Sequence, residues 1–296
     1  MRLNPTTFGP LAPYLLDLAA GFEARGVPLM LVGGFGLVLR RQWRQEQGER
    51  TLIEAIPPAR ATEDFDVLLT LELLENPKQR QAIREALTQL GYQVALQNLH
   101  FVKPGSGGVG RRDVKVDFLA PPAPSGSTTL KEKQFRVGPS NSTEADKLHG
   151  YKTPEAALLQ GEMLTVSLEG QGTGGVERAT RVVLPHPFML TLMKLCAFRD
   201  EFEGRKSEGR MRRDLTAKHV SDVYTLVALL TQSEADSLPK LQAQNVAHAV
   251  VQDAQSIVKT LLADGQTPGT LLLRENLSIA SNDLTVFLDM LNETFG

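Results

Sequence analysis

The stretch RATEDFDVLL, residues 60–69, decides how this chain is interpreted. Two aspartates, Asp64 and Asp66, stand one residue apart at the head of a run that is otherwise apolar. Aspartate is among the residues that β-strands tolerate least, and a buried carboxylate without a partner is costly. A strand that begins with such a pair therefore requires a counter-charge or a ligand elsewhere in the fold.

The two aspartates are expected to share one face of a strand, because alternate residues point the same way and lie roughly 6–7 Å apart. A third carboxylate, Asp117, lies in VKVDFLA, a second segment with strand-like alternation. Three carboxylates from two adjacent strands would form an oxygen-rich site, which suits Mg²⁺ or Mn²⁺. Such ions serve in-line phosphoryl or nucleotidyl displacement. On its own, an Asp-x-Asp pair is also common as a turn or as a strand-end cap.

A glycine pair precedes the aspartates. Residues 31–34, LVGG, predict a short strand followed by Gly33, Gly34 and then a helix. Exposed N–H groups at a helix N-terminus favour an anion, and glycine lets a phosphate approach the backbone closely. The alternative is a tight strand-to-helix turn with no ligand.

The composition excludes several classes of protein. Of 296 residues, 42% are hydrophobic and 22% are charged, which is ordinary for a globular chain of one large or two modest domains. The net charge of −2 gives no global footprint for nucleic acid. A single cysteine, Cys196, excludes a disulfide framework or a cysteine-cluster metal site. With no signal-peptide pattern and no apolar run long enough for a membrane span, we expect a soluble, cytoplasmic protein without a membrane partner.

Periodicity divides the chain into a mixed half and a helical half. Helices are predicted at 10–26, 35–45, 76–90, 187–199, 213–230, 241–263 and 284–295, and strands at 28–32, 65–70, 92–97, 99–103, 113–119, 164–168 and 178–184. This order predicts the α+β class, with a core over residues 1–185 and a helical C-terminal domain over residues 186–296.

Three blocks in this order resemble a known superfamily. LVGGFGLVLR, RATEDFDVL and VKVDFL are similar to the nucleotidyltransferases with the DNA polymerase β-like fold. In their common pattern Gly-Gly or Gly-Ser precedes R-x-T-x-D-h-D, where h is apolar, and an h-D-h strand follows. Within the superfamily the chain looks most like the AbiEii-like toxins of type IV toxin–antitoxin systems, over about residues 28–230. The gap between Gly34 and Asp64 is longer than usual, which predicts an insertion around residues 41–58.

The resemblance implies a polymerase β-like core, a mixed sheet with flanking helices, that moves a nucleoside monophosphate from an NTP to an acceptor and releases pyrophosphate. It implies Mg²⁺ or Mn²⁺ on Asp64, Asp66 and Asp117, and it implies NTP contacts from Gly33, Gly34, Arg60 and Thr62. By the same analogy the acceptor is a tRNA or a protein, and a cognate antitoxin is a possible partner. Two alternatives stay open: a nucleotide-binding module without catalysis, and a transferase that modifies a small molecule such as an antibiotic.

The helical half contains one charge in an apolar setting. Lys194 is the only charged residue in PFMLTLMKLCAF, which is apolar nearly all round and so predicts a buried helix. A buried ammonium needs a partner, unless its stem carries it along the helix to water. Asp214, Lys218 and Asp222 stand at i, i+4 and i+8, by default a solvated ion-pair ladder. The resemblance implies instead that Lys194 contacts phosphate and that Asp222 orients it.

Two further features of this half carry weaker signals. His219 is a possible proton carrier, although a single helix histidine is more often a surface or core residue. Between two predicted helices, the basic loop Arg205–Arg213 could meet RNA phosphates, although most charge runs are simply solvated.

Overall fold

The computed structural model describes residues 1–3, 8–57, 62, 64–95, 100–104, 113–122, 134–138, 143, 147–159, 161–208 and 213–296. These residues form two compact units. The sheet unit comprises Met1–Leu39, Arg60–Ala157 and Met163–Pro185, and the helical unit comprises Arg40–Ala59, Leu158–Glu162 and His186–Gly296. The predicted α+β class is confirmed.

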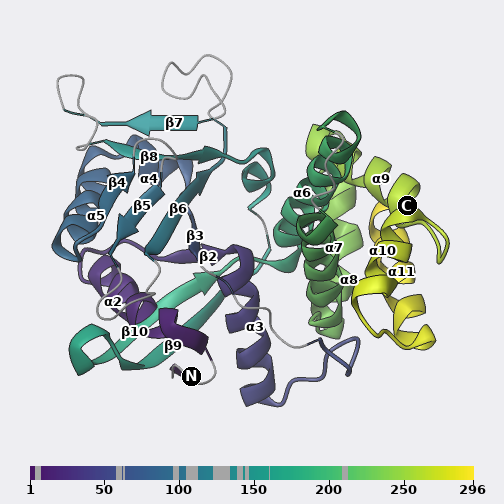
Figure 1. Cartoon of the computed structure of the whole chain (residues 1–296), viewed down its shortest axis with the longest axis horizontal. Coiled ribbons are helices and arrows are strands. Elements are labelled where there is room, and N and C mark those ends of the chain that lie inside the picture. The colour runs from purple at the N-terminus through teal and green to yellow at the C-terminus, as the bar shows by residue number, and fades with distance from the viewer. Residues whose placement is uncertain are drawn as a thin grey trace. The chain divides into compact units, whose positions relative to one another are not determined.

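The sheet unit is built on one mixed sheet of ten strands (Figure 1). Its main path runs β1-β9-β10-β2-β3-β6-β5-β4, with β8 paired to β6 and β7 paired to β8. The strands are β1 (Arg2–Leu3), β2 (Met30–Val32), β3 (Asp64–Leu68), β4 (Gln93–Ala95), β5 (His100–Lys103), β6 (Val114–Ala120), β7 (Gln134–Val137), β8 (Leu148–Lys152), β9 (Leu164–Gln171) and β10 (Glu177–Leu184). β3 runs parallel to β6 and antiparallel to β2, and β5 runs antiparallel to β6.

Helices α2 (Ala12–Glu23), α4 (Leu71–Glu75) and α5 (Pro77–Gln89) accompany this sheet, as does the first part of α3 (Gly33–Gln47), with short 3₁₀ turns η1 (Gly9–Leu11), η3 (Pro154–Leu158) and η4 (Thr173–Gly175). α5 begins where the sequence signals it, because the Asn76 side chain accepts hydrogen bonds from the backbone N–H groups of Lys78 and Gln79. Pro77 then occupies the first helical position, where its missing N–H costs nothing. α2 packs against α5 and against β9 and β10.

The helical unit consists of α6 (Pro187–Glu208), α7 (Arg213–Ala228), α8 (Gln232–Gln244), α9 (Ala249–Leu261), α10 (Pro268–Asn276) and α11 (Ser281–Phe295) (Figure 1). One apolar cluster fills it. Phe188, Leu192 and Leu195 of α6 meet Val220 and Tyr224 of α7 there, together with buried residues of α9–α11. α6 is apolar nearly all round because other helices of its unit cover it.

Several predicted elements differ from those found. The helix predicted at 241–263 is two helices, α8 and α9, which are separated by residues 245–248. α10, β7, β8 and α4 were not predicted, because each is short and lacks a clear period. α6 continues to Glu208, so Arg205–Glu208 belong to a helix and not to the predicted basic loop.

The predicted insertion has a definite place. Residues 40–59 belong to the helical unit, although the sequence pattern assigned them to the first domain; the same holds for residues 158–162. Ile53 is buried in the core of that unit. The backbone N–H of Leu52 donates to the carbonyl of Leu230 over 2.8 Å. An apolar anchor and backbone hydrogen bonds explain why this segment packs with the helices.

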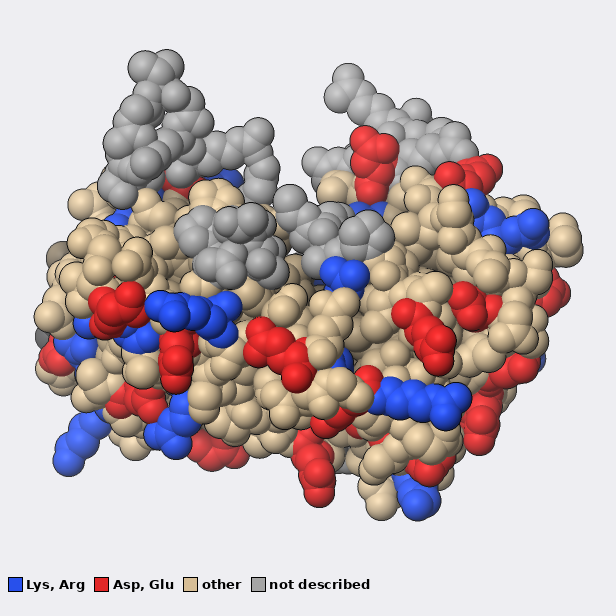
Figure 2. Space-filling view, turned by 90° about the horizontal axis from the view of Figure 1, so that it is seen from below, with Lys and Arg blue, Asp and Glu red and all other residues tan. Residues whose placement is uncertain are grey.

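The surface carries charges of both signs. On the face that Figure 2 shows, acidic and basic side chains of the described residues are interspersed, in keeping with the small net charge of the sequence. Within the described part of the chain, no helix combines the length and apolar character needed to cross a bilayer.

Candidate functional site

Three carboxylates share one face of the sheet unit at the junction of β3 and β6. Asp66 is in register with Asp117 on the parallel neighbour, and Asp64 lies two residues before Asp66 on the same face. Phe65 and Val67, on the opposite face, are fully buried. We call Asp64, Asp66 and Asp117 the carboxylate face. Directly paired strands lie about 4.8 Å apart, so the register brings two of these side chains to neighbouring positions.

The glycine pair lies at the same place in the sheet. β2 pairs with β3 so that Val32 is opposite Asp66, and α3 begins immediately afterwards at Gly33. Gly33 has φ +63°, and a Cβ on it would overlap the Asp66 carboxylate. Only glycine combines that backbone conformation with that close approach. The first N–H groups of an α-helix have no partner inside the helix, so this corner presents backbone donors next to a carboxylate.

The structure describes two of the three remaining NTP contacts that were predicted for the sheet unit. The Thr62 hydroxyl donates to Asp64 Oδ1 over 3.1 Å, so it holds the carboxylate of that residue. Gly34 lies in the first turn of α3. Arg60 falls outside the described residues.

His100 contacts the carboxylate face, and the sequence analysis did not identify it as a site residue. Its ring Nδ1–H donates to Asp117 Oδ1. β5 and β6 are antiparallel with Phe101 opposite Val116, which brings His100 level with Asp117. Strand alternation could indicate which side of β5 His100 occupies, but not which strand lies beside it. The pairing register, a tertiary property, decides the contact.

Burial raises the pKa of the Asp117 carboxyl. The hydrogen bond and charge of His100 lower this pKa, and the negative charge of Asp64 raises it. The pKa of Tyr151 on β8 is raised by burial and then by the charge of Asp117. Lys115, opposite Asp64 in the register, supplies positive charge. The charges of Asp64 and Asp117 therefore influence one another.

The donor chemistry of this face fits a hard divalent cation, because all three predicted ligands are carboxylates. As the described side chains stand, no group of three or more His, Cys, Asp or Glu residues is gathered to hold a metal ion. One oxygen of Asp117 is engaged by His100, and one oxygen of Asp64 accepts the Thr62 hydroxyl.

The helical unit contains the second predicted group. Lys194 Nζ of α6 lies 2.7 Å from Asp222 Oδ2 of α7. Their side chains are 14% and 6% exposed, so this is a largely buried ion pair between two helices and not part of a solvated ladder. The structure brings together the two residues that the resemblance pairs; their part in a reaction stays a prediction. His219 is half-buried on α7, and the side chains of Arg205–Arg213 fall outside the described residues.

Comparison with known proteins identified no relative of this chain. No family model matches the chain, and no curated protein or solved structure matches it either. The resemblance to AbiEii-like nucleotidyltransferases therefore stays a prediction that rests on the sequence blocks.

Proposed function

We propose that this protein is a metal-dependent nucleotidyltransferase that moves a nucleoside monophosphate from an NTP to an acceptor hydroxyl. The observation that carries the proposal is the register of β2, β3 and β6. It gathers the Gly33 turn, the Asp64–Asp66 pair and Asp117 at one corner of a mixed sheet. These residues come from three separated stretches of sequence. An Asp pair with a purely structural role would require neither the Gly33 turn nor Asp117 beside it.

Each group has a task that follows from its chemistry. Asp64, Asp66 and Asp117 are the residues that would hold Mg²⁺ or Mn²⁺, which when bound neutralises phosphate charge. The N–H groups at the start of α3 are suited to triphosphate oxygens. The acceptor oxygen forms a bond to the α-phosphorus while the bond to the β-phosphate oxygen breaks, so that pyrophosphate leaves with the electron pair. Asp117 is the residue that would take the hydroxyl proton, because burial raises its pKa and a carboxylate of higher pKa is a better base.

The test is transfer of label. Wild type is incubated with Mg²⁺, each α-labelled NTP in turn, and total tRNA or cell lysate. We expect label on a macromolecule with wild type and none above background with Asp66→Ala. Asp113→Ala is the matched control, because Asp113 is an exposed carboxylate just before β6 and lies outside the carboxylate face. Circular dichroism checks that both variants fold. Full transfer by Asp66→Ala would exclude the proposed site.

A second candidate is a nucleotide-binding module without transfer. The contact between His100 and Asp117 favours it, because a carboxylate oxygen that accepts a hydrogen bond from a histidine is less open to another ligand. This candidate predicts binding of an NTP without release of pyrophosphate. Equilibrium binding of the NTPs alongside the transfer assay separates the two candidates.

A further inference from the structure

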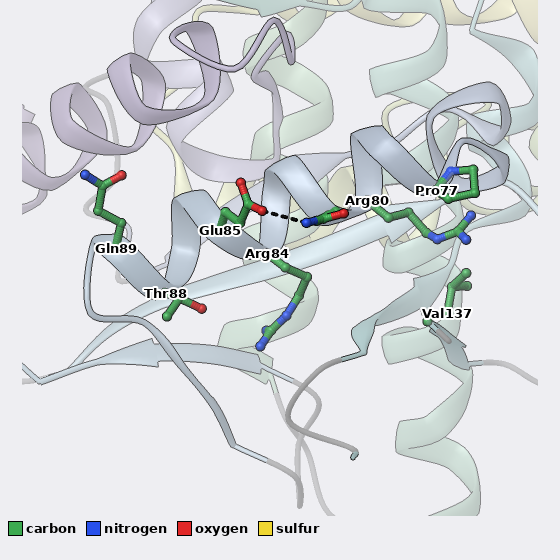
Figure 3. A pocket seen from close by; sticks show the side chains of 9 residues that line it. Pro77, Arg80, Arg84, Glu85, Thr88, Gln89 and Val137 are labelled. Atoms are coloured by element: carbon green, nitrogen blue, oxygen red, sulfur yellow. Dashed lines mark hydrogen bonds between the residues drawn. The ribbon is translucent and has the colours of Figure 1, made fainter. Parts of the chain in front are cut away.

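A separate groove lies between α5 and the end of β7 in the sheet unit (Figure 3). Its volume is about 580 Å³, within the range of small-molecule sites in proteins. The lining residues are Pro77, Arg80, Gln81, Arg84, Glu85, Thr88, Gln89, Val137 and Gly138. Seven of the nine belong to α5, so the groove follows one stripe of that helix.

The groove lies on the opposite face of the sheet from the carboxylates. The Arg84 guanidinium carbon is 5.2 Å from the centre of the Phe101 ring. Phe101 is adjacent in β5 to His100, which contacts Asp117, and successive residues of a strand point to opposite faces. The sheet therefore separates the groove from Asp64, Asp66 and Asp117, and the two regions can be tested independently.

Two arginines give the groove its positive character. Arg80 and Arg84 are one helical turn apart, about 6 Å along the axis, and both are half-buried. Arg80 Nη1 donates to the carbonyl of Leu74 at the end of α4, which fixes its guanidinium group. A guanidinium has five N–H donors, so this one bond leaves Arg80 able to bind an anion as well. The Phe101 ring similarly positions the guanidinium of Arg84.

The rest of the lining favours an anion over a cation. Glu85 is the one acidic residue among the lining residues, and its Oε1 accepts a hydrogen bond from Gln81 over 2.8 Å, drawn as a dashed line in Figure 3. The Thr88 hydroxyl adds a donor. Val137 and Pro77 add apolar surface, against which a sugar or a base can pack. Arginine pairs well with phosphate because its planar fork matches two phosphate oxygens.

We propose that this groove binds a phosphate ester anion, with Arg80 and Arg84 as the recognising groups. A free nucleotide and a single strand of RNA both carry this chemistry, and both have flat rings for the apolar wall. The proposal does not depend on the proposed transferase activity, because the carboxylate face takes no part in it.

The test is binding of a 5′-fluorescein-labelled 12-nucleotide RNA, followed by fluorescence anisotropy in EDTA so that no metal is bound. We expect Arg84→Gln to weaken binding by about tenfold, because a charge-assisted hydrogen bond to phosphate is lost. Lys78→Gln is the matched control, since it removes one positive charge from an exposed position of α5 outside the groove. It should bind within about twofold of wild type, because exposed charges contribute little.

Two further variants make the test decisive. Thr88→Trp fills the groove without removing a cation, at an exposed position, and it should lose binding as Arg84→Gln does. Asp66→Ala should bind like wild type.

Displacement of the RNA by unlabelled AMP would identify a nucleotide site, and displacement by unlabelled RNA alone would identify a strand-binding groove; either result supports the proposal. It is overturned if wild type does not bind the probe, if Thr88→Trp binds normally, if Lys78→Gln loses as much as Arg84→Gln, or if Asp66→Ala abolishes binding.

Discussion

Two groups of charged residues in this molecule contrast sharply. On the carboxylate face of the sheet unit, three half-buried carboxylates share one face of two neighbouring strands, and a histidine donates to one of them. In the helical unit, Arg40 Nη1 and Arg44 Nη2 both donate to Glu234 Oε1, over 2.8 and 2.6 Å, and Arg44 also pairs with Glu49. We call Arg40, Arg44, Glu49 and Glu234 the arginine cluster. The arginine cluster contains two positive and two negative side chains.

The contrast teaches how a structural group differs from a candidate site. Arg40 is 1% exposed, and the carboxylate of Glu234 compensates its charge within the protein. A buried ion pair of this kind is costly to break. The three carboxylates of the carboxylate face are only half-buried, so they stay accessible from solvent. The partial exposure of these carboxylates, in contrast to the burial of Arg40, is the reason why we propose the carboxylate face as the candidate site.

The largest expected effect comes from breaking the arginine cluster. Glu234→Gln keeps the side-chain shape and the N-terminal capping box of α8 with Thr231, but it removes the negative charge that pairs with the buried guanidinium of Arg40. We expect the free energy of unfolding to fall by about 3 kcal/mol, measured by urea denaturation. Glu293→Gln, at an exposed position on α11, is the control and should change stability by less than about 0.5 kcal/mol. Equal effects of the two substitutions would mean that the cluster is not a buried structural pair.

A smaller effect is expected at the carboxylate face. Gly33→Ala should destabilise the protein by about 1–2 kcal/mol through its positive φ, and further through overlap with Asp66. Gly26→Ala isolates the first contribution, because Gly26 has φ +68° and open space around its Cβ position. The double variant Gly33→Ala with Asp66→Ala should recover part of the excess. If Gly33→Ala and Gly26→Ala have the same thermal midpoint, the close approach of Asp66 to Gly33 is not tight.

The smallest effect is a pH dependence in the helical unit. Burial lowers the pKa of His186 below its ordinary 6.5, so the unfolded chain binds a proton more readily than the folded one. Stability is therefore retained above pH 6.5 and declines as the pH falls below that value. His186 Nδ1 accepts the backbone N–H of Phe188 at the start of α6, a role that an Asn side chain can also fill. His186→Asn should thus flatten the decline in thermal midpoint between pH 6.5 and 5. An unchanged slope would assign the acid sensitivity to other groups.

Much of the sheet unit was predictable from the sequence because its signals are local. The alternation predicted strands that contain Asp66 and Asp117, with Asp64 at the head of the first, and the glycines marked the start of α3 within two residues. The split of 241–263 into two helices was not predictable, because a hydrophobic period can continue across a break in the backbone. The sequence also did not indicate that residues 40–59 belong to the helical unit, because a polar segment between two motifs does not show which core its few apolar residues join.

The sequence by itself determined the α+β class, the apolar α6 with Lys194 inside it, and the order of the glycine pair and the three carboxylates. These follow from period, residue type and spacing, which act over a few residues. Only the tertiary structure decided that His100 donates to Asp117 and that Arg40 and Arg44 share Glu234. These partners are between 17 and 194 residues apart in the chain, and strand register and helix packing, which sequence period does not encode, bring them together.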